Sequence, residues 1–193
     1  MPYREIKFLK DTLVHIYNRA NDGNILFRSS SDYEWFTQKT LKVGLPGACL
    51  IPAYCLMPTH FHFYLKLKED FEISRLLQRL ELAYAKYFNR KYNSHGHVFE
   101  GPFKSKPVIK ESYAIYLCKY VHLNPVKGDL VTKPEEWRYS NYRDVINGNI
   151  TDDISSFYGT SFKSPSDYQL FVNDGDDSYE KDIKDFLFFE GGE

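Results

Sequence analysis

The run from residue 60 to residue 67, HFHFYLKL, alternates polar and apolar side chains, which is the pattern of a half-buried strand. Successive side chains of a strand point to opposite faces. Phenylalanine and leucine therefore share one face, which predicts packing on a core. The other face begins with His60 and His62, whose Cα atoms lie roughly 7 Å apart. That face is available for chemistry.

Strand and helix patterns alternate along the chain before and after this run. Pro125 disfavours helical geometry at the residue before it, so the third helix is expected to end at Asn124. The order predicts an α+β fold, an antiparallel sheet with helices packed on one face. The expected strands are 12–17, 48–57 and 61–68, an extended segment lies at 98–109, and the expected helices are 31–43, 73–92, 111–124 and 137–147.

Charge is unevenly distributed over the 193 residues. Residues 150–193 contain 11 acidic residues and three lysines, whereas the preceding residues have a net positive charge. A basic body suits a polyanionic partner, although on charge alone a solvated surface is the simpler interpretation. The change in composition divides the chain into a domain at 1–148 and an acidic C-terminal appendage at 149–193.

The cysteines and the apolar segments indicate a cellular setting. Cys49, Cys55 and Cys118 occur singly, which argues against a zinc cluster and a disulfide framework. The N-terminal residues lack the apolar run of a signal peptide, and no segment approaches the roughly 18 apolar residues of a membrane span. We expect a cytoplasmic protein with no membrane partner.

The histidine pair alone leaves two interpretations open. His60 and His62 are either half-exposed surface residues or two ligands of one metal ion, and a metal needs a further ligand nearby. The helix expected to end at Asn124 offers one, because an amide oxygen can bind a hard cation. Tyr120 lies one helical turn earlier on the same face and offers a phenol. Packing on the sheet is the simpler role for this tyrosine taken alone. His15 in the first strand could lie near the site, although a satisfied sheet histidine is the simpler interpretation.

Four blocks in order resemble the single-tyrosine HUH transposases, in particular the REP-associated tyrosine transposases, across about residues 12–148. Thr59 and Pro102 depart from the family pattern, as does the early NRAND block. The four blocks are YCLMPTHFHFYLKL, AYAKYFNRKYNSHGHVFEGPFKSKPV, YLCKYVHLNPVKGDLV and EEWRYSNYRDV.

The resemblance implies a ferredoxin-like or RRM-like HUH nuclease fold and a reaction. Tyr120 matches the nucleophile, which attacks single-stranded DNA and forms a 5′-phosphotyrosine before strand transfer. His60, His62 and Asn124 match the ligands of Mg²⁺ or Mn²⁺. The resemblance also implies hairpin-forming DNA as the partner, a homodimer and a nucleoid-associated protein.

Basic residues interleaved with aromatic residues flank the matched blocks, as in grooves that bind single-stranded DNA. For any single one of them, a solvated surface group is the simpler interpretation. The candidate DNA-binding residues are Arg19, Arg90, Lys91, Lys104, Lys106 and Lys127.

Two alternatives to an active transposase stay open at this point. One is a non-catalytic nucleic-acid-binding protein on the same fold. The other is a metal hydrolase in which the histidine pair activates water. The presence of all four proposed site residues favours an active transposase over the first alternative. Tyr120 discriminates a transposase from the second, because only strand transfer through a covalent adduct needs a phenol.

Overall fold

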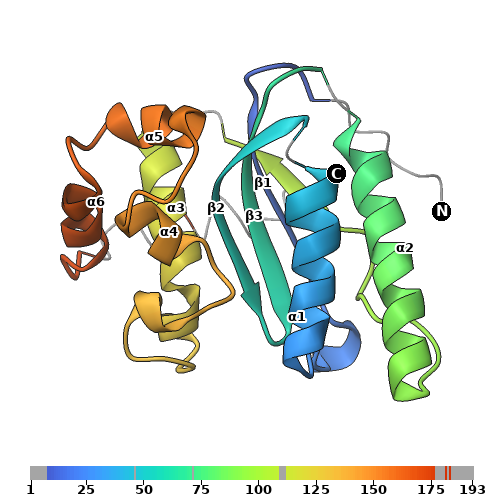
Figure 1. Ribbon diagram of the computed structural model, residues 1–193. Helices are drawn as coiled ribbons and strands as arrows, with labels where there is room; N and C mark the ends of the chain where they lie inside the picture. Colours follow the sequence, from blue (N-terminus) through green and yellow to red (C-terminus); the bar gives the residue numbers. More distant parts are fainter. Residues whose placement is uncertain are drawn as a thin grey trace.

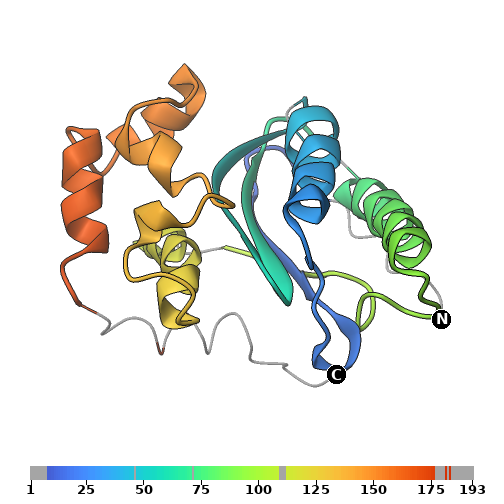
Figure 2. The same ribbon diagram turned by 60° about the horizontal axis from the view of Figure 1, so that its bottom comes forward.

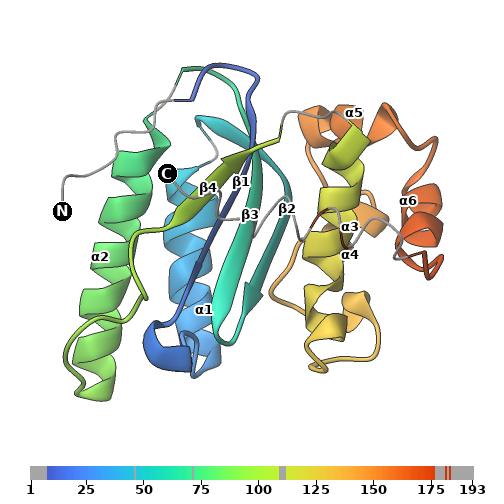
Figure 3. The same cartoon turned by 180° about the vertical axis from the view of Figure 1, so that it is seen from behind.

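A four-stranded antiparallel sheet in the order β2-β3-β1-β4 forms the centre of the computed structural model (Figure 1). The structure describes residues 8–45, 47–70, 72–108, 112–176, 181 and 183. A tight turn at residues 58–59 joins β2 to β3. The strands are β1 (Leu13–Arg19), β2 (Cys49–Met57), β3 (His60–Leu67) and β4 (Lys104–Pro107), with short β4 at the edge beside β1 (Figure 3).

One face of the sheet is covered by α1 (Ser30–Thr37) and α2 (Ile73–Tyr92). The apolar side chains of β3, such as Phe61 and Phe63, are fully buried there, against Phe36 of α1 in the same cluster. This confirms the face assignment that the alternation of β3 predicts. A π-helical segment, η2 (Gln38–Gly44), extends α1, and a short 3-10 turn, η1 (Asn21–Gly23), follows β1.

A second layer of helices lies on the opposite face of the sheet (Figure 2). The α+β class and the antiparallel sheet are confirmed. The prediction that helices pack on one face only is wrong, because helices cover both faces of the sheet. The second face is apolar where β2 meets β3, because Cys55 and Tyr64 are fully buried there together with Leu117. The helices of this layer are α3 (Ser112–Lys127), α4 (Tyr142–Ile146), α5 (Asp152–Gly159) and α6 (Pro165–Val172), with η3 (Pro134–Glu136) between α3 and α4.

The helix α3 continues through Pro125 to Lys127, so the prediction that it ends at Asn124 is wrong. Proline removes one donor and disfavours helical geometry before it, but neither effect forbids a final turn. Backbone bonds beyond the proline close this turn, from Gly128 N to Asn124 O and from Leu130 N to Pro125 O, both 2.9 Å. Asn124 is therefore held in helical geometry.

The helices after residue 148 share a core with the sheet. Tyr168 of α6 lies 2.7 Å from His122 Nδ1, and the Tyr158 hydroxyl of α5 donates to Pro52 O at 2.9 Å. Lys119, one residue before Tyr120, is buried and forms an ion pair with Asp174. Within the described part of the chain, each helix is too short or too polar to cross a lipid bilayer.

The segment around Asn141 closes the outer edge of β2. The Asn141 side chain accepts from Tyr54 N at 2.8 Å and donates to Pro52 O at 2.9 Å. Leu56 N donates to Tyr139 O at 2.9 Å. An exposed strand edge is a site for unwanted pairing, and these bonds satisfy its backbone groups.

We expect Asn141→Ala to lower the free energy of unfolding by about 2–4 kcal/mol, because the Tyr54 backbone N–H and the buried Nε2 atom of His122 lose their bonds to the Asn141 oxygen. Urea unfolding measures the change. Asn149→Ala is the matched control, since Asn149 is exposed and its replacement should change stability little. Equal losses in the two variants would contradict this account of the edge.

A buried carboxylate on α2 ties β1 to the segment that follows α2. The Asn18 amide donates to Glu81 Oε1 at 2.8 Å and to Gly101 O at 2.9 Å, and Glu81 also accepts from the Phe103 backbone. Burial raises the pKa of Glu81 to about 7, although these hydrogen bonds oppose the shift.

Because the pKa of Glu81 is higher in the folded protein than in the unfolded chain, its contribution to stability is fully present below about pH 4.5 and is lost as the pH rises through about 7. We expect the stability difference between Glu81→Gln and the wild type to change in favour of the variant by about 2–3 kcal/mol between pH 4 and pH 8. Urea unfolding of both proteins across this range measures it. The titrations of the histidines affect both proteins equally and cancel when their stabilities are subtracted. A stability difference that does not change with pH would contradict the raised pKa of Glu81.

Candidate active site

The two histidines of β3 begin the strand at the end nearest the β2–β3 turn. Strand pairing places His60 opposite Arg19 of β1 and His62 opposite Tyr17. The two imidazole centroids are 5.0 Å apart, and the ring planes are nearly perpendicular. His62 is buried and His60 is partly buried. The predicted pair therefore lies side by side, beneath a helical layer rather than on an open face.

Each imidazole has its Nδ1 atom engaged by a neighbour. His60 Nδ1 lies 2.9 Å from Thr59 Oγ1, and His62 Nδ1 lies 3.0 Å from His15 Nε2. Burial lowers the pKa of both rings, and for His62 it does so well below the usual value. The rings are therefore neutral at neutral pH, and a neutral imidazole has a lone pair that can bind a metal.

The helix α3 brings the other two predicted residues to this pair. The Tyr120 ring lies 5.9 Å from the His62 ring, centroid to centroid, and nearly perpendicular to it. A hydrogen bond from His60 to the Asn124 side chain raises the pKa of His60, against the larger effect of burial. The Asn124 amide donates to Tyr120 O at 2.8 Å. All four predicted site residues thus gather at one place.

The donor set fits a hard divalent cation. Among the described residues, no group of three His, Cys, Asp or Glu side chains forms a metal site. A third protein ligand for His60 and His62 must come from another residue type, and Asn124 stands beside His60. Two imidazoles and one amide oxygen suit Mg²⁺ or Mn²⁺ better than a structural zinc ion.

A cavity of about 560 Å³ opens in front of these residues. His60, His62 and Tyr120 line one part of it, and Arg19 and Lys104 line another. Its size is within the range of small-ligand sites, so it can hold part of a nucleotide chain. Asn18, Thr59 and Glu100 also line it.

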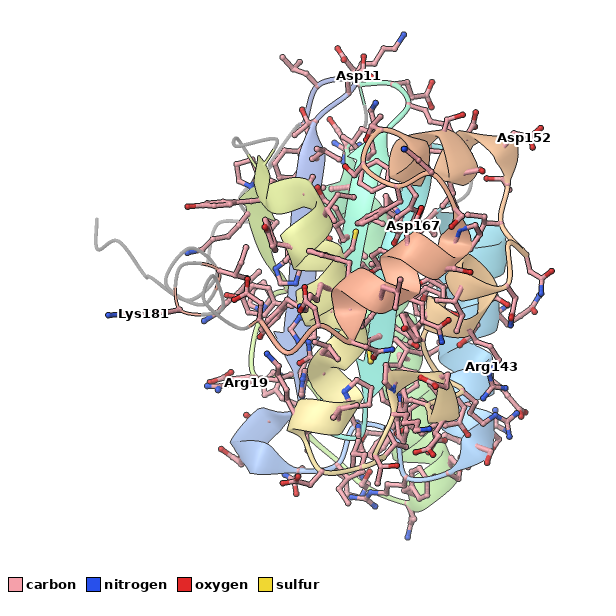
Figure 4. The ribbon with its side chains drawn as sticks, turned by 90° about the vertical axis from the view of Figure 1, so that its left-hand side faces the viewer. Asp11, Arg19, Arg143, Asp152, Asp167 and Lys181 are labelled. Atoms are coloured by element: carbon pink, nitrogen blue, oxygen red, sulfur yellow. The ribbon has the colours of Figure 1, made fainter. Side chains whose placement is uncertain are left out.

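The predicted DNA-binding residues are divided between the two sides of the sheet. Arg19 stands at the opposite end of β1 from Asp11 (Figure 4), beside the cavity. It forms an ion pair with Glu100, with 2.6 Å between Arg19 Nη2 and Glu100 Oε1. Lys104 lines the cavity, and Lys106 follows two positions later on the same face of β4.

The remaining three basic residues lie outside the cavity. Arg90 and Lys91 are on α2, which covers the face of the sheet opposite α3. Lys91 also forms an ion pair with Asp32, with 2.5 Å between Lys91 Nζ and Asp32 Oδ1. Lys127 is the last residue of α3 and is exposed.

Sequence reasoning gives no role to two residues that stand at the site. His15 hydrogen-bonds His62 directly, and Glu100 holds Arg19. Finding them requires the register of β1 on β3 and the path of the chain after α2, which no short-range pattern gives. His122, which also lacks a predicted role, is buried and bonded to Tyr168 and Asn141.

Comparisons with known proteins agree with this geometry. A solved structure described as the REP-associated tyrosine transposase bound to a REP hairpin has a TM-score of 0.60 to this chain at 18% identity, covering 78% of this chain and 88% of its own. At that identity the comparison shows a similar fold and no more than that. No curated protein matches the chain.

The family model described as "Transposase IS200 like" matches residues 13–124, which is more than half of the chain and includes all four predicted site residues. The chain therefore belongs to the IS200-like transposase family.

Proposed function

We propose that this protein nicks single-stranded DNA in a metal-dependent reaction and transfers the strand through a 5′-phosphotyrosine intermediate. The observation that carries the proposal is that Tyr120, His60 and His62 line one cavity while Asn124 bonds to His60. A phenol beside a set of metal ligands is a nucleophile suited to attack on a phosphodiester. Family membership supports transposase-type DNA processing.

In the first step Tyr120 Oη attacks the phosphorus of one phosphodiester. A bond forms between Oη and phosphorus, the bond from phosphorus to the 3′ oxygen breaks, and the phenolic proton passes through solvent to that oxygen, which leaves as a 3′-OH. The phosphotyrosine keeps the bond energy, so no nucleoside triphosphate is needed. Attack by a 3′-OH on the phosphotyrosine then rejoins the DNA and frees Tyr120.

His60, His62 and Asn124 would hold Mg²⁺ or Mn²⁺. Such a cation, when bound, polarises a non-bridging phosphate oxygen and stabilises the developing charge. The chain contributes by keeping both imidazoles neutral through burial and by fixing their Nδ1 atoms, so that Nε2 of each ring can serve as the donor atom.

The proposed partner is single-stranded DNA that contains hairpin-forming repeats. The solved relative is bound to a REP hairpin, and that observation supports a hairpin here. We assign phosphate contacts at the cavity to Arg19 and Lys104. We assign contacts outside it to Lys106, Lys127, Arg90 and Lys91. We further propose a homodimer that acts in the cytoplasm on the nucleoid.

We expect Tyr120→Phe to abolish covalent adducts with labelled single-stranded hairpin DNA in the presence of Mn²⁺, because phenylalanine has no nucleophilic oxygen. Denaturing gels measure the adduct. Tyr116→Phe is the matched control, one helical turn earlier on α3, and should form adducts as the wild type does. Removing the metal with a chelator should have the same effect as Tyr120→Phe.

Three results would contradict the proposal. Adducts formed by Tyr120→Phe would show that another residue is the nucleophile. Tight hairpin binding without any adduct, over a broad set of hairpins and with Mn²⁺ present, would favour the non-catalytic binding protein. Metal-dependent cleavage that survives Tyr120→Phe would favour the metal hydrolase.

We expect Arg19→Gln to weaken binding of single-stranded DNA and to lower the slope of log affinity against log salt by about 0.7, the value for one lost phosphate contact. Glu100→Gln should strengthen binding, because Arg19 then does not have to give up its ion pair with Glu100 in order to contact a phosphate. Fluorescence anisotropy at several salt concentrations measures both. Arg79→Gln, on the exposed face of α2, is the control and should change neither quantity. An equal effect of Arg79→Gln would show that only the overall charge matters.

A further inference from the structure

His15 occupies an unusual position for a core residue. It lies in the middle of β1 with no exposed surface, and its Nε2 atom is 3.0 Å from Nδ1 of His62. The two ring planes differ by 14°, and the centroids are 5.1 Å apart, well beyond the distance between the two nitrogens. The rings therefore meet edge to edge, in the geometry of an N–H···N hydrogen bond rather than of face-to-face stacking.

The direction of this hydrogen bond decides what His62 can do. A neutral imidazole has one N–H and one lone pair, on different nitrogens. If His62 donates from Nδ1, its lone pair is on Nε2, which is free to bind a metal. If His15 donates instead, His62 carries its proton on Nε2 and cannot be a ligand through that atom.

We propose that His15 is a positioning residue, which accepts the Nδ1–H of His62 and so holds that ring in the tautomer whose Nε2 atom can bind a cation. The inference rests on the proposed function, since it assigns a role at the metal site. Metal-binding histidines generally donate their second N–H to an acceptor that fixes tautomer and orientation, usually a carboxylate or a carbonyl. Here a second imidazole takes that place.

A second observation argues against a purely structural role. Nδ1 of His15 is buried and has no hydrogen-bond partner among the described residues. An unpaired polar atom in a core is unfavourable, so each instance needs an explanation. An apolar residue at position 15 would avoid the cost. Tyr17, which stacks on His15 at 5.1 Å between centroids, supplies packing but does not pair this nitrogen in the described contacts.

Metal binding tests the proposal without DNA. We expect His15→Phe, which keeps a flat ring but has no acceptor, to weaken Mn²⁺ binding by about 10–100-fold. His15→Gln keeps an acceptor oxygen and should remain closer to the wild type. Titration calorimetry measures the affinity, and thermal unfolding checks each variant. His95→Gln, at an exposed histidine after α2, is the matched control and should leave Mn²⁺ affinity unchanged. Unchanged affinity in His15→Phe would overturn the proposal.

The tautomer itself is measured by nitrogen-15 NMR of the metal-free wild type, which needs no variant to fold. The proposal expects the His62 proton on Nδ1 and is overturned if that proton is on Nε2. If the wild type binds no Mn²⁺, the metal step of the proposed function fails, and the NMR result still decides whether His15 is the acceptor. The two failures are therefore distinguishable.

Discussion

The candidate site depends above all on the antiparallel pairing of β1 with β3. At this register Tyr17 faces His62 and Arg19 faces His60, while the apolar side chains of β3 enter the core. A slip by one residue would send the histidines into that core and Phe61 and its apolar neighbours out of it. The same burial that fixes the strands therefore fixes the side chains that carry the chemistry.

The second helical layer then supplies Tyr120, the candidate nucleophile. Helical spacing puts Tyr120 and Asn124 on one face of α3, and the layer behind α3 holds the helix against the sheet. Lys119 and His122 point to that layer and bond to Asp174 and Tyr168. The acidic C-terminal half of this layer is thus part of the support of the site, since a carboxylate from it neutralises a buried lysine next to Tyr120.

The parts of the structure that depend on local patterns could be predicted. The alternation in β3 predicted a strand and its buried face, and the 3.6-residue repeat predicted the bounds of α2. The motif blocks indicated the four candidate site residues. The continuation of α3 through Pro125 was missed because the proline rule is a preference that later backbone bonds overcome. His15, Glu100 and the packing of α5 and α6 depend on contacts between residues far apart in the sequence, and no spacing rule encodes those.

The placement of Tyr120 next to His62 has a consequence for assembly. Both residues belong to one chain, and the helix that carries the tyrosine is fixed to its own sheet by buried contacts. A single polypeptide thus brings the candidate nucleophile and the candidate metal ligands together, and the site that we propose is complete without a helix from a second chain.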